Sequence, residues 1–370
     1  MTHQQQQESP SEVLIPLNTV EDRHGIDVKQ HNFNFDAIRG IASLMVLVDH
    51  VTQIWCVDTC ASNAIHDLLQ AGRLGVIYFF VLSGYIMAQR YYPVFYTSLA
   101  PLKLYYRFLY NRTMRLMPLH WFAVVAISIP IAYVYQLDVI QHQPVAQFVY
   151  TCYFGFNPIV PGTTPVFMEP TWSIGVEMMF YVTTPFWFLY AFAFEHKEAT
   201  AWILFASAAL VSVASKEFLA DNARDYFVFW FRIHQYLAGV LLQVFHHNSV
   251  PLTRKEHAND VIFWITLFIN IGLMRVINEF YVLPLIMLQI WHADTIVIPS
   301  LHLTLFQRLA DVSFPLYLIH LPLAFLFHTL LQDVPLWFSL ALYLHTVFTF
   351  AWLLHLLFEV WFYKKMAVKI

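Results

Sequence analysis

An arginine and a histidine lie within the first long apolar stretch of the chain, FDAIRGIASLMVLVDH, where ionisable side chains are costly and often functional. At about 100° per residue, the spacing between Arg39 and His50 places both on one helical face, about 16 Å apart along the axis. Arg39 suits a phosphate or a thioester oxygen, and His50 suits removal of a proton from a hydroxyl group. The spacing fits equally an arginine that reaches the headgroups and a histidine in a structural hydrogen bond.

A second basic element runs from Lys103 to Trp121. Arg112 and Arg115 are neighbours on one helical face at the expected inner membrane boundary, and Arg107 precedes them. Guanidinium pairs of this kind bind phosphate-rich groups through paired hydrogen bonds. Ordinary anchoring of positive charge at the inner membrane surface is the alternative, and it accounts for most such clusters.

The apolar segment EPTWSIGVEMMFY carries a carboxylate, because Glu177 stands about one and a half turns inside the expected helix. Trp172 and Ser173 precede it at the outer end. A buried carboxylate needs a partner or a proton. Glu177 is therefore expected to orient an imidazole or to pair with an arginine, and a purely structural ion pair is the alternative.

The late segment FPLYLIHLP places Tyr317 and His320 on neighbouring helical faces, shortly before Pro322. Proline has no N–H group and leaves a main-chain carbonyl without its helical donor. His320 is expected to bond a carbonyl freed in this way, since membrane helices satisfy such groups internally. The structural role of His320 and a role in catalysis both remain open at this point.

Membrane helices must position these residues, because 59% of the chain is hydrophobic, 12% is charged and the mean hydropathy is +0.55. Soluble domains carry roughly 25% charged residues. The sequence thus predicts an all-α, polytopic integral membrane protein with about ten transmembrane helices, each of about 17–25 residues. The expected spans are 35–55, 74–90, 117–136, 171–193, 200–216, 226–245, 260–277, 280–298, 312–331 and 335–361.

Lysine and arginine in short loops predict the orientation of these spans. An inside N-terminus puts most of them on the cytoplasmic side: Arg23, Lys29, Arg90, Lys103, Arg107, Arg112, Arg115, Lys197, Arg254, Lys255, Arg308, Lys364, Lys365 and Lys369. Arg73, Lys216, Arg224, Arg232 and Arg275 then fall at or near the outside. We therefore expect both termini to be cytoplasmic.

The domain organisation follows from the same pattern. Residues 1–34 are polar and predict a disordered cytoplasmic tail without a cleaved signal, residues 35–363 form the membrane domain, and residues 364–370 form a short cytoplasmic tail. The outer segment 136–170 is long enough to fold over an outer cavity. Cys56 and Cys60 would face the same side, either as a disulfide or as small apolar residues.

Partners of two kinds are not expected. The net charge is −4 and no basic tract lies outside the short loops, which argues against nucleic acid. No spacing of cysteine and histidine resembles a zinc site, so no metal is expected.

Five of these segments together resemble the acyltransferase-3 family of membrane proteins. FDAIRGIASLMVLVDH is similar to the family's opening, NRTMRLMPLHW to its arginine-rich entry to the third span, WSIGVEMMFY to its tryptophan–serine–glutamate motif, and FPLYLIHLP to its late tyrosine–histidine motif. GVIYFFVLSGYIMA resembles the second-span motif in Gly75, Val76, Phe79, Phe80, Ser83 and Gly84. Each match alone is weak, whereas five in family order are strong.

The resemblance implies transfer of an acyl group, usually acetyl from acetyl-coenzyme A, to a hydroxyl of an extracytoplasmic glycan or lipid-linked sugar. Arg39 and His50 would then be the essential pair, and Glu177 would support the site. The coenzyme side would be served by Arg112 and Arg115, with Arg107 beside them, and the supporting residues would be Ser83, Trp172, Ser173, Tyr317 and His320. Ser83 has no adjacent base, and close helix packing explains Ser83–Gly84 better than a nucleophile does.

The chain departs from the family pattern at Ala37, His120 and Met178, where glycine, tyrosine and a second acidic residue are usual. No esterase-like domain follows the last span, which implies the stand-alone form. The expected protein is an O-acetyltransferase of the bacterial inner membrane that modifies lipopolysaccharide O-antigen or exopolysaccharide. The alternatives are a transporter or flippase of a glycan or lipid-linked intermediate, which would favour an internal repeat not seen here, and a sensor or interaction protein.

Overall fold

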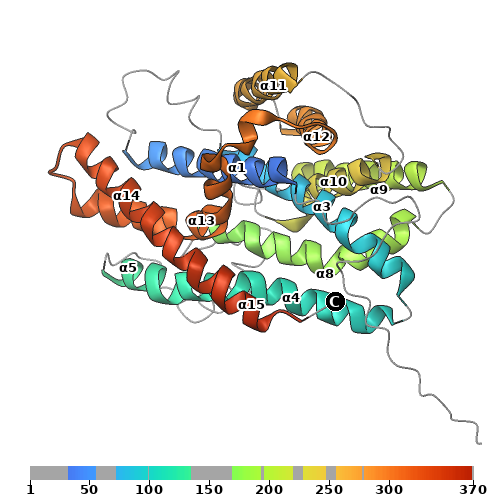
Figure 1. Ribbon diagram of the computed structural model, residues 1–370, viewed down its shortest axis with the longest axis horizontal. Coiled ribbons are helices and arrows are strands. Elements are labelled where there is room, and N and C mark those ends of the chain that lie inside the picture. The colour runs from blue at the N-terminus through green and yellow to red at the C-terminus, as the bar shows by residue number, and fades with distance from the viewer. Residues whose placement is uncertain are drawn as a thin grey trace, which may run out of the picture.

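The computed structural model describes residues 32–55, 72–98, 100–134, 169–192, 196–219, 228–246, 256–276 and 279–368 (Figure 1). In these ranges the chain is helical with short connections and contains no strand, which confirms the all-α prediction. The expected tail up to residue 31, the outer segment up to residue 168 and the three cysteines lie outside the described residues.

The first helices are α1 (Phe33–Trp55), α3 (Gly72–Thr97), α4 (Pro101–Phe122), the π-helical η1 (Ala123–Ser128) and α5 (Ile129–Val134). The middle of the chain forms η2 (Glu169–Thr171), α8 (Trp172–Phe192), α9 (Lys197–Leu219), η4 (Phe229–Phe231) and α10 (Ile233–His246). The last elements are α11 (Glu256–Val276), α12 (Glu279–Thr295), η5 (Pro299–His302), α13 (Thr304–Leu330), α14 (Leu336–Leu354), η6 (His355–Phe362) and α15 (Tyr363–Met366).

Six of the described helices are long and apolar enough to cross a bilayer, which makes the protein a multi-pass membrane protein. The helix that corresponds to the predicted third span, residues 117–136, begins well before it. The helix begins at Pro101 and continues through η1 and α5 to Val134. Proline is favoured in the first helical turn, and arginine, lysine and leucine are good helix formers, so the whole basic run is helical.

Helix α1 lies in the centre of the bundle and runs side by side with α13 in the same direction. A Cβ atom on Gly40 would lie 2.9 Å from the main-chain nitrogen of Ala310, and further along the ring of Trp55 contacts that of His328. Helix α3 runs opposite to α1, since Phe35 near the start of α1 contacts Tyr85 in the second half of α3. The contacts with α13 and α3 therefore fix the position of α1 along its axis.

Helices α3 and α10 cross with their backbones in contact at two glycines. A Cβ atom on Gly84 would lie 2.0 Å from the main-chain oxygen of Tyr236, and one on Gly239 would lie 2.0 Å from that of Val81. Small residues allow such approach in membranes, where packing rather than burial from water drives association. The prediction that Gly84 serves close helix packing is confirmed.

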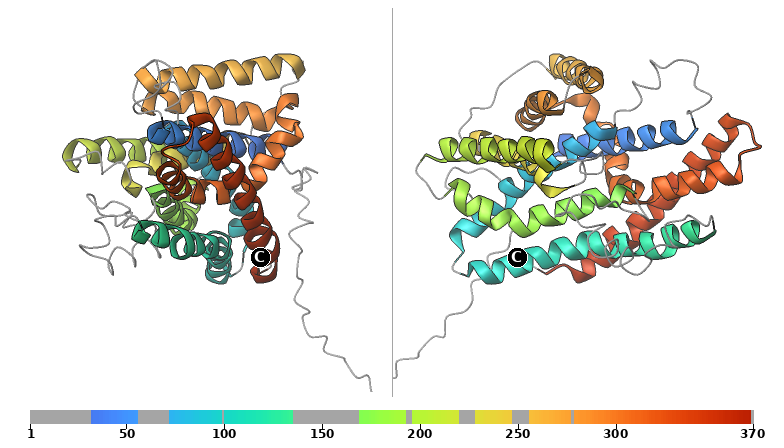
Figure 2. Two further views of the ribbon diagram at one scale, coloured as in Figure 1. Left: turned by 90° about the vertical axis from the view of Figure 1, so that its left-hand side faces the viewer. Right: turned by 180° about the vertical axis from the view of Figure 1, so that it is seen from behind.

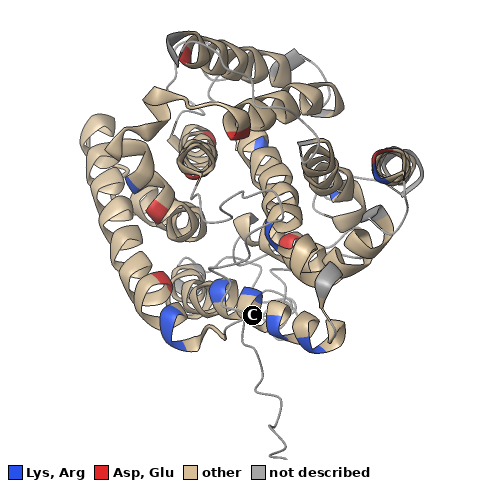
Figure 3. Cartoon of the chain, turned by 45° about the vertical axis from the view of Figure 1, so that its right-hand side comes forward, with Lys and Arg blue, Asp and Glu red and all other residues tan. Residues whose placement is uncertain are grey.

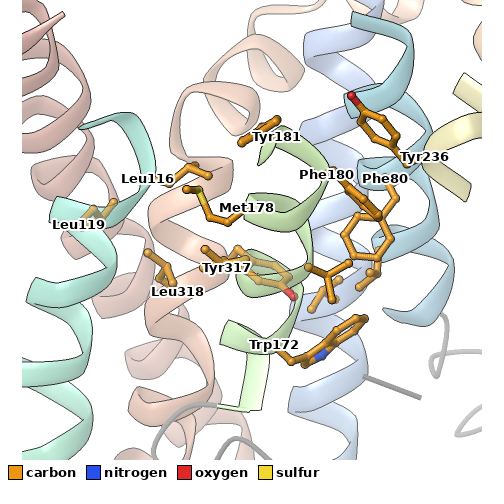
Figure 4. Packing of buried hydrophobic residues seen from close by; sticks show 14 of the residues in the cluster. Phe80, Leu116, Leu119, Trp172, Met178, Phe180, Tyr181, Tyr236, Tyr317 and Leu318 are labelled. Carbon is orange, nitrogen blue, oxygen red and sulfur yellow. The ribbon is translucent and has the colours of Figure 1, made fainter. Parts of the chain in front are cut away.

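Helix α8 stands between two layers of helices. Figure 4 shows Phe80, Phe180 and Tyr236 on one side of it and Leu116, Leu119 and Met178 on the other. The rings of Phe180 and Tyr236 stack at 4.6 Å, and Phe80 meets Phe180 edge to face at 5.1 Å. This aromatic packing fixes the side chains of α8 relative to α3 and α10.

The pair α11 and α12 packs across the bundle. Both helices appear nearly end-on in Figure 1, where α1, α3, α4 and α8 run across the view, and they lie lengthwise in the left view of Figure 2. A buried polar network holds them: Gln289 donates to Thr266 at 2.9 Å, Asn270 donates to Gln289 at 2.7 Å, and Tyr78 of α3 also donates to Gln289. Each amide thereby has a partner inside the apolar packing.

Basic side chains gather where α1, α4, α9 and α13 begin and where α3, α8, α14 and α15 end, and we call this the basic end. Figure 3 shows many of them along α4 and near the C-terminus. The described members are Arg39, Arg90, Lys103, Arg107, Arg112, Arg115, Lys197, Arg308, Lys364 and Lys365. Arg73 and Arg232 lie at the opposite end, at the starts of α3 and α10.

The glycine contact between α3 and α10 gives a direct test of the packing. Gly84→Ala should lower the free energy of unfolding by about 1–3 kcal/mol or more, because the added methyl group meets main-chain atoms that cannot rotate away. The matched control is Gly272→Ala on α11, where a Cβ atom meets nothing within 4 Å. This control should be neutral or stabilise by up to about 1 kcal/mol. Thermal unfolding in detergent measures both, and equal midpoints would contradict the described contact.

Candidate functional site

His50 of α1 contacts His320 of α13 inside the bundle. Nδ1 of His50 lies 2.9 Å from Nε2 of His320, and the ring centroids are 5.0 Å apart. His320 is buried and its own carbonyl accepts a hydrogen bond from the hydroxyl of Tyr343 at 3.0 Å. The parallel packing of α1 and α13 brings together two histidines that are 270 residues apart in the chain.

The expected carbonyl partner of His320 needs a correction. Its Nδ1 bonds the carbonyl oxygen of Leu316 at 3.1 Å, one turn earlier on the same helix. The carbonyl that Pro322 leaves without a helical donor is that of Leu318, four residues before the proline. The hydrogen bond therefore does not compensate for the proline, and it orients the imidazole ring instead.

Tyr317 and Ser173 join the late motif to the start of α8. Their hydroxyl oxygens are 2.7 Å apart, and the hydroxyl of Tyr317 donates to the carbonyl of Pro170 at 3.0 Å. The ring of Tyr317 also lies 6.0 Å from that of His320. Trp172 is buried next to these groups, with its ring against Phe80. Two motifs that are far apart in the sequence thus form one polar contact beside the histidine pair.

Glu177 binds hydroxyl groups, where the sequence led us to expect an imidazole or an arginine. Tyr181, one turn later on α8, donates to its carboxylate, and Ser83 of α3 lies 3.4 Å from the same oxygen. Because Tyr181 also contacts Arg112 through its ring, the carboxylate is linked to a guanidinium indirectly. Ser83 has a polar contact of its own, in addition to its place beside Gly84.

Arg112 lies in a buried aromatic pocket. Its Nη2 donates to the hydroxyl of Tyr91 at 2.6 Å, and its guanidinium lies 4.9 Å from the ring centre of Tyr91, 5.5 Å from that of Tyr181 and 5.7 Å from that of Phe108. Such contacts hold a cation in a place with little water. Within the described part of the chain, Nε of Arg112 has no hydrogen-bond partner. This Nε atom is buried, and the guanidinium is held by Tyr91 and by its aromatic neighbours.

Three other arginines lie within electrostatic range of Arg90. Arg90, at the basic end of α3, is repelled by Arg112, Arg115 and Arg39. Arg39 forms an ion pair with Asp36, one turn earlier, and its Nε has no hydrogen-bond partner among the described residues. We call these four side chains the arginine cluster. Like charges held together in this way favour a multiply charged anion between them.

Arg90 was missed by the sequence analysis as a site residue. It stands at the end of an apolar span, where a basic residue usually indicates membrane anchoring. Its charge was visible, whereas its closeness to Arg39 depends on the packing of α3 against α1.

Arg107 does not share the pocket of Arg112. Five residues separate them on α4, which turns their side chains about 140° apart. Arg107 lines a separate surface cavity of about 540 Å³ together with Tyr106, Leu109, Tyr110, Thr113 and Val368. The chain end is held there by Asn111, whose amide donates to the carbonyl of Val368 at 2.7 Å and accepts from its N–H at 2.8 Å. Arg107 and Arg112 thus lie on an outer and an inner face of α4.

The comparisons with known proteins identify the family of the chain. A family model described as "Acyltransferase domain" matches residues 32–356, which is most of the chain. The chain belongs to the acyltransferase-3 family. The resemblance inferred from five motifs is thereby confirmed, and the protein is a membrane acyltransferase. No curated protein and no solved structure matches this acyltransferase-3 protein. Among its described residues, no group of three or more His, Cys, Asp or Glu side chains could hold a metal ion.

The link between Glu177 and Arg112 can be tested through Tyr181. Tyr181→Phe keeps the ring against Arg112 but removes the hydroxyl that donates to the partly buried carboxylate. A side-chain hydrogen bond contributes about 0.5–1.5 kcal/mol, so the unfolding midpoint of this acyltransferase-3 protein should fall measurably. Tyr281→Phe, at an exposed tyrosine of α12, is the control and should change nothing measurable. Identical midpoints for both variants would show that the contact contributes no stability.

Proposed function

We propose that this membrane acyltransferase moves an acetyl group from cytoplasmic acetyl-coenzyme A to a hydroxyl of an extracytoplasmic surface polysaccharide, such as O-antigen or exopolysaccharide, in the bacterial inner membrane. The observation that carries the proposal is the contact between His50 and His320 inside the bundle. His50 lies on α1, the helix that also carries Arg39 of the arginine cluster. One helix thereby connects an anion-binding group with a group that can move a proton.

The proposed orientation has ten crossings and both termini in the cytoplasm. Its support is the uneven distribution of positive charge, since ten described lysines and arginines lie at the basic end and Arg73 and Arg232 at the other. The relative directions agree with alternating crossings, because α1 runs parallel to α13 and opposite to α3. The basic end would then face the cytoplasm, where acetyl-coenzyme A is made.

The arginine cluster suits the phosphate groups of coenzyme A. Guanidinium groups bind phosphate oxygens through paired hydrogen bonds, and the Nε atoms of Arg39 and Arg112 have no hydrogen-bond partner in the described part of the protein. From the cluster, a line of polar contacts runs inward from Arg112 through Tyr181 to Glu177 and Ser83. The long arm of coenzyme A would carry the thioester from the cluster toward the middle of the bundle.

His50 would act where the thioester meets the acceptor. In one route His50 removes the proton of the acceptor hydroxyl, the oxygen attacks the thioester carbon, and the thiolate leaves and takes up a proton. In the other route His50 carries the acetyl group before the acceptor receives it. Both routes give an acetyl ester and coenzyme A. Both also need an unprotonated ring nitrogen on His50.

Labelled acetyl-coenzyme A tests the proposal in membranes that contain the acceptor glycan. His50→Ala should reduce the label in the glycan by about 10²–10⁴-fold, because the proton-moving group is lost. The matched control is His345→Ala on α14, where the side chain is exposed on the bundle surface, and it should keep the activity. Normal acetylation by His50→Ala, measured as radioactivity and as glycan mass, would refute the role of His50.

Binding of the donor is a separate test. Coenzyme A should raise the unfolding midpoint of the wild-type protein, and Arg112→Ala with Arg115→Ala should abolish the rise, since each lost charge-assisted hydrogen bond costs about 1.5–3 kcal/mol. Arg107→Ala should keep most of it, because Arg107 faces the other cavity. Stabilisation that persists in the double variant would place the donor site away from the cluster, whereas no stabilisation of the wild type would refute coenzyme A as the donor.

A further inference from the structure

The hydrogen positions in the histidine pair follow from what each partner can donate or accept. A main-chain carbonyl oxygen only accepts, so the 3.1 Å contact between Nδ1 of His320 and the oxygen of Leu316 requires a hydrogen on that nitrogen. A neutral imidazole has a single N–H, which leaves Nε2 of His320 as an acceptor. Because Nδ1 of His50 lies 2.9 Å from this nitrogen, His50 must be the donor.

The assignment also requires that both rings are neutral. The neutral form of the two adjacent rings has the lowest free energy inside the bundle, since an unpaired buried charge is unfavourable. Neutral His50 then has no hydrogen on Nε2.

We infer that His320 is a positioning residue that holds His50 in the form protonated on Nδ1 and thereby makes Nε2 of His50 the reactive atom. The inference rests on the proposed function, in which His50 takes part in acyl transfer. A histidine base or nucleophile works through an unprotonated nitrogen, and the hydrogen bond made by the other nitrogen decides which one that is.

The surroundings of His320 fit this role. Pro170, Ser173 and Tyr317 form a hydrogen-bonded group beside it, and Tyr343 donates to its carbonyl oxygen. His320 is 1% exposed, whereas His50 is partly exposed, so His50 is the ring that a substrate can reach. The buried histidine is therefore fixed on its helix, and its Nε2 presents a single acceptor to His50.

The chemical step balances with these atoms. The acceptor O–H bond breaks and its proton goes to Nε2 of His50, the oxygen forms a bond to the thioester carbon, and the carbon–sulfur bond breaks. The ring of His50 is then positively charged, and its Nδ1–H donates a stronger hydrogen bond to Nε2 of His320. The proton on Nε2 passes to the thiolate, which leaves as a thiol. If Nε2 instead attacks the thioester, the same lone pair is used.

Three substitutions of His320 separate this role from packing. Glutamine places an amide oxygen near the position of Nε2 and still accepts from His50, whereas asparagine is too short to reach and leucine has no acceptor. His320→Gln should keep kcat within about tenfold of wild type. His320→Asn and His320→Leu should lower kcat by about 100-fold or more with the KM for acetyl-coenzyme A nearly unchanged. Thermal unfolding checks that each variant is folded. If His320→Leu does not fold, His320→Asn provides the same test.

A spectroscopic readout tests the tautomer without any reaction. In protein with ¹⁵N-labelled histidine rings, the signals that disappear in His50→Gln belong to His50. Wild type and His320→Gln should show a hydrogen on Nδ1 of His50, and His320→Asn and His320→Leu should show a shift toward the form protonated on Nε2. The same tautomer in all four proteins would overturn the inference, and so would full activity of His320→Leu.

These outcomes are distinct from failure of the proposed function. If His50→Gln itself retains acetyl transfer, His50 has no part in the reaction and both proposals fall. If His50→Gln is inactive while His320→Leu and His320→Gln are equally active, the function stands and only the positioning role of His320 is refuted.

Discussion

The parallel packing of α1 against α13 is the contact on which the site depends. At Gly40 the two helices approach so closely that a side chain would collide with the main chain at Ala310. From this point both helices run in the same direction, and ten residues further along each one stands a histidine, His50 and His320. The helix separation set at the glycine therefore determines whether these two rings can hydrogen-bond. If α1 and α13 ran in opposite directions, the close contact between Gly40 and Ala310 would not also bring His50 and His320 together.

The contacts of the other polar side chains follow from a second constraint, the apolar packing that surrounds them inside the bundle. Groups that face the interior must bind one another, and hydroxyls of tyrosine and serine do most of this. Tyr181 satisfies Glu177 while its ring faces Arg112, and Tyr91 accepts from the same arginine. Tyrosine can pack against apolar side chains through its ring and form a hydrogen bond through its hydroxyl group. A carboxylate and a guanidinium thereby remain within one bundle without direct contact.

The sequence was sufficient for the fold class and the family, and insufficient for the partners of each side chain. Hydrophobicity predicts helices locally, and the five motifs are local strings, so both could be read from neighbouring residues. The pairing of His50 with His320 depends on which helices pack together, and no spacing along the chain contains that information. Arg107 and Arg112 were grouped because they are close in sequence, yet helical phase alone turns them about 140° apart. Arg90 was counted only as a charge on the cytoplasmic side, because its electrostatic interaction with Arg39 depends on the packing of α3 against α1.

In the proposed function, α1 connects the arginine cluster with the histidine pair through Arg39 and His50, and this favours group transfer across the membrane over movement of a whole solute. A carrier that alternates between sides needs a binding site that both sides can reach, and such sites usually lie between two similar halves of the chain. Here the arginine cluster lies at the basic end and the histidine pair lies deeper on α1, beside groups at the start of α8. The proposed donor, held by its phosphates at the arginine cluster, can present a small acyl group at the histidine pair. Only the acyl group has to pass, and the helices need not rearrange around the donor or the acceptor.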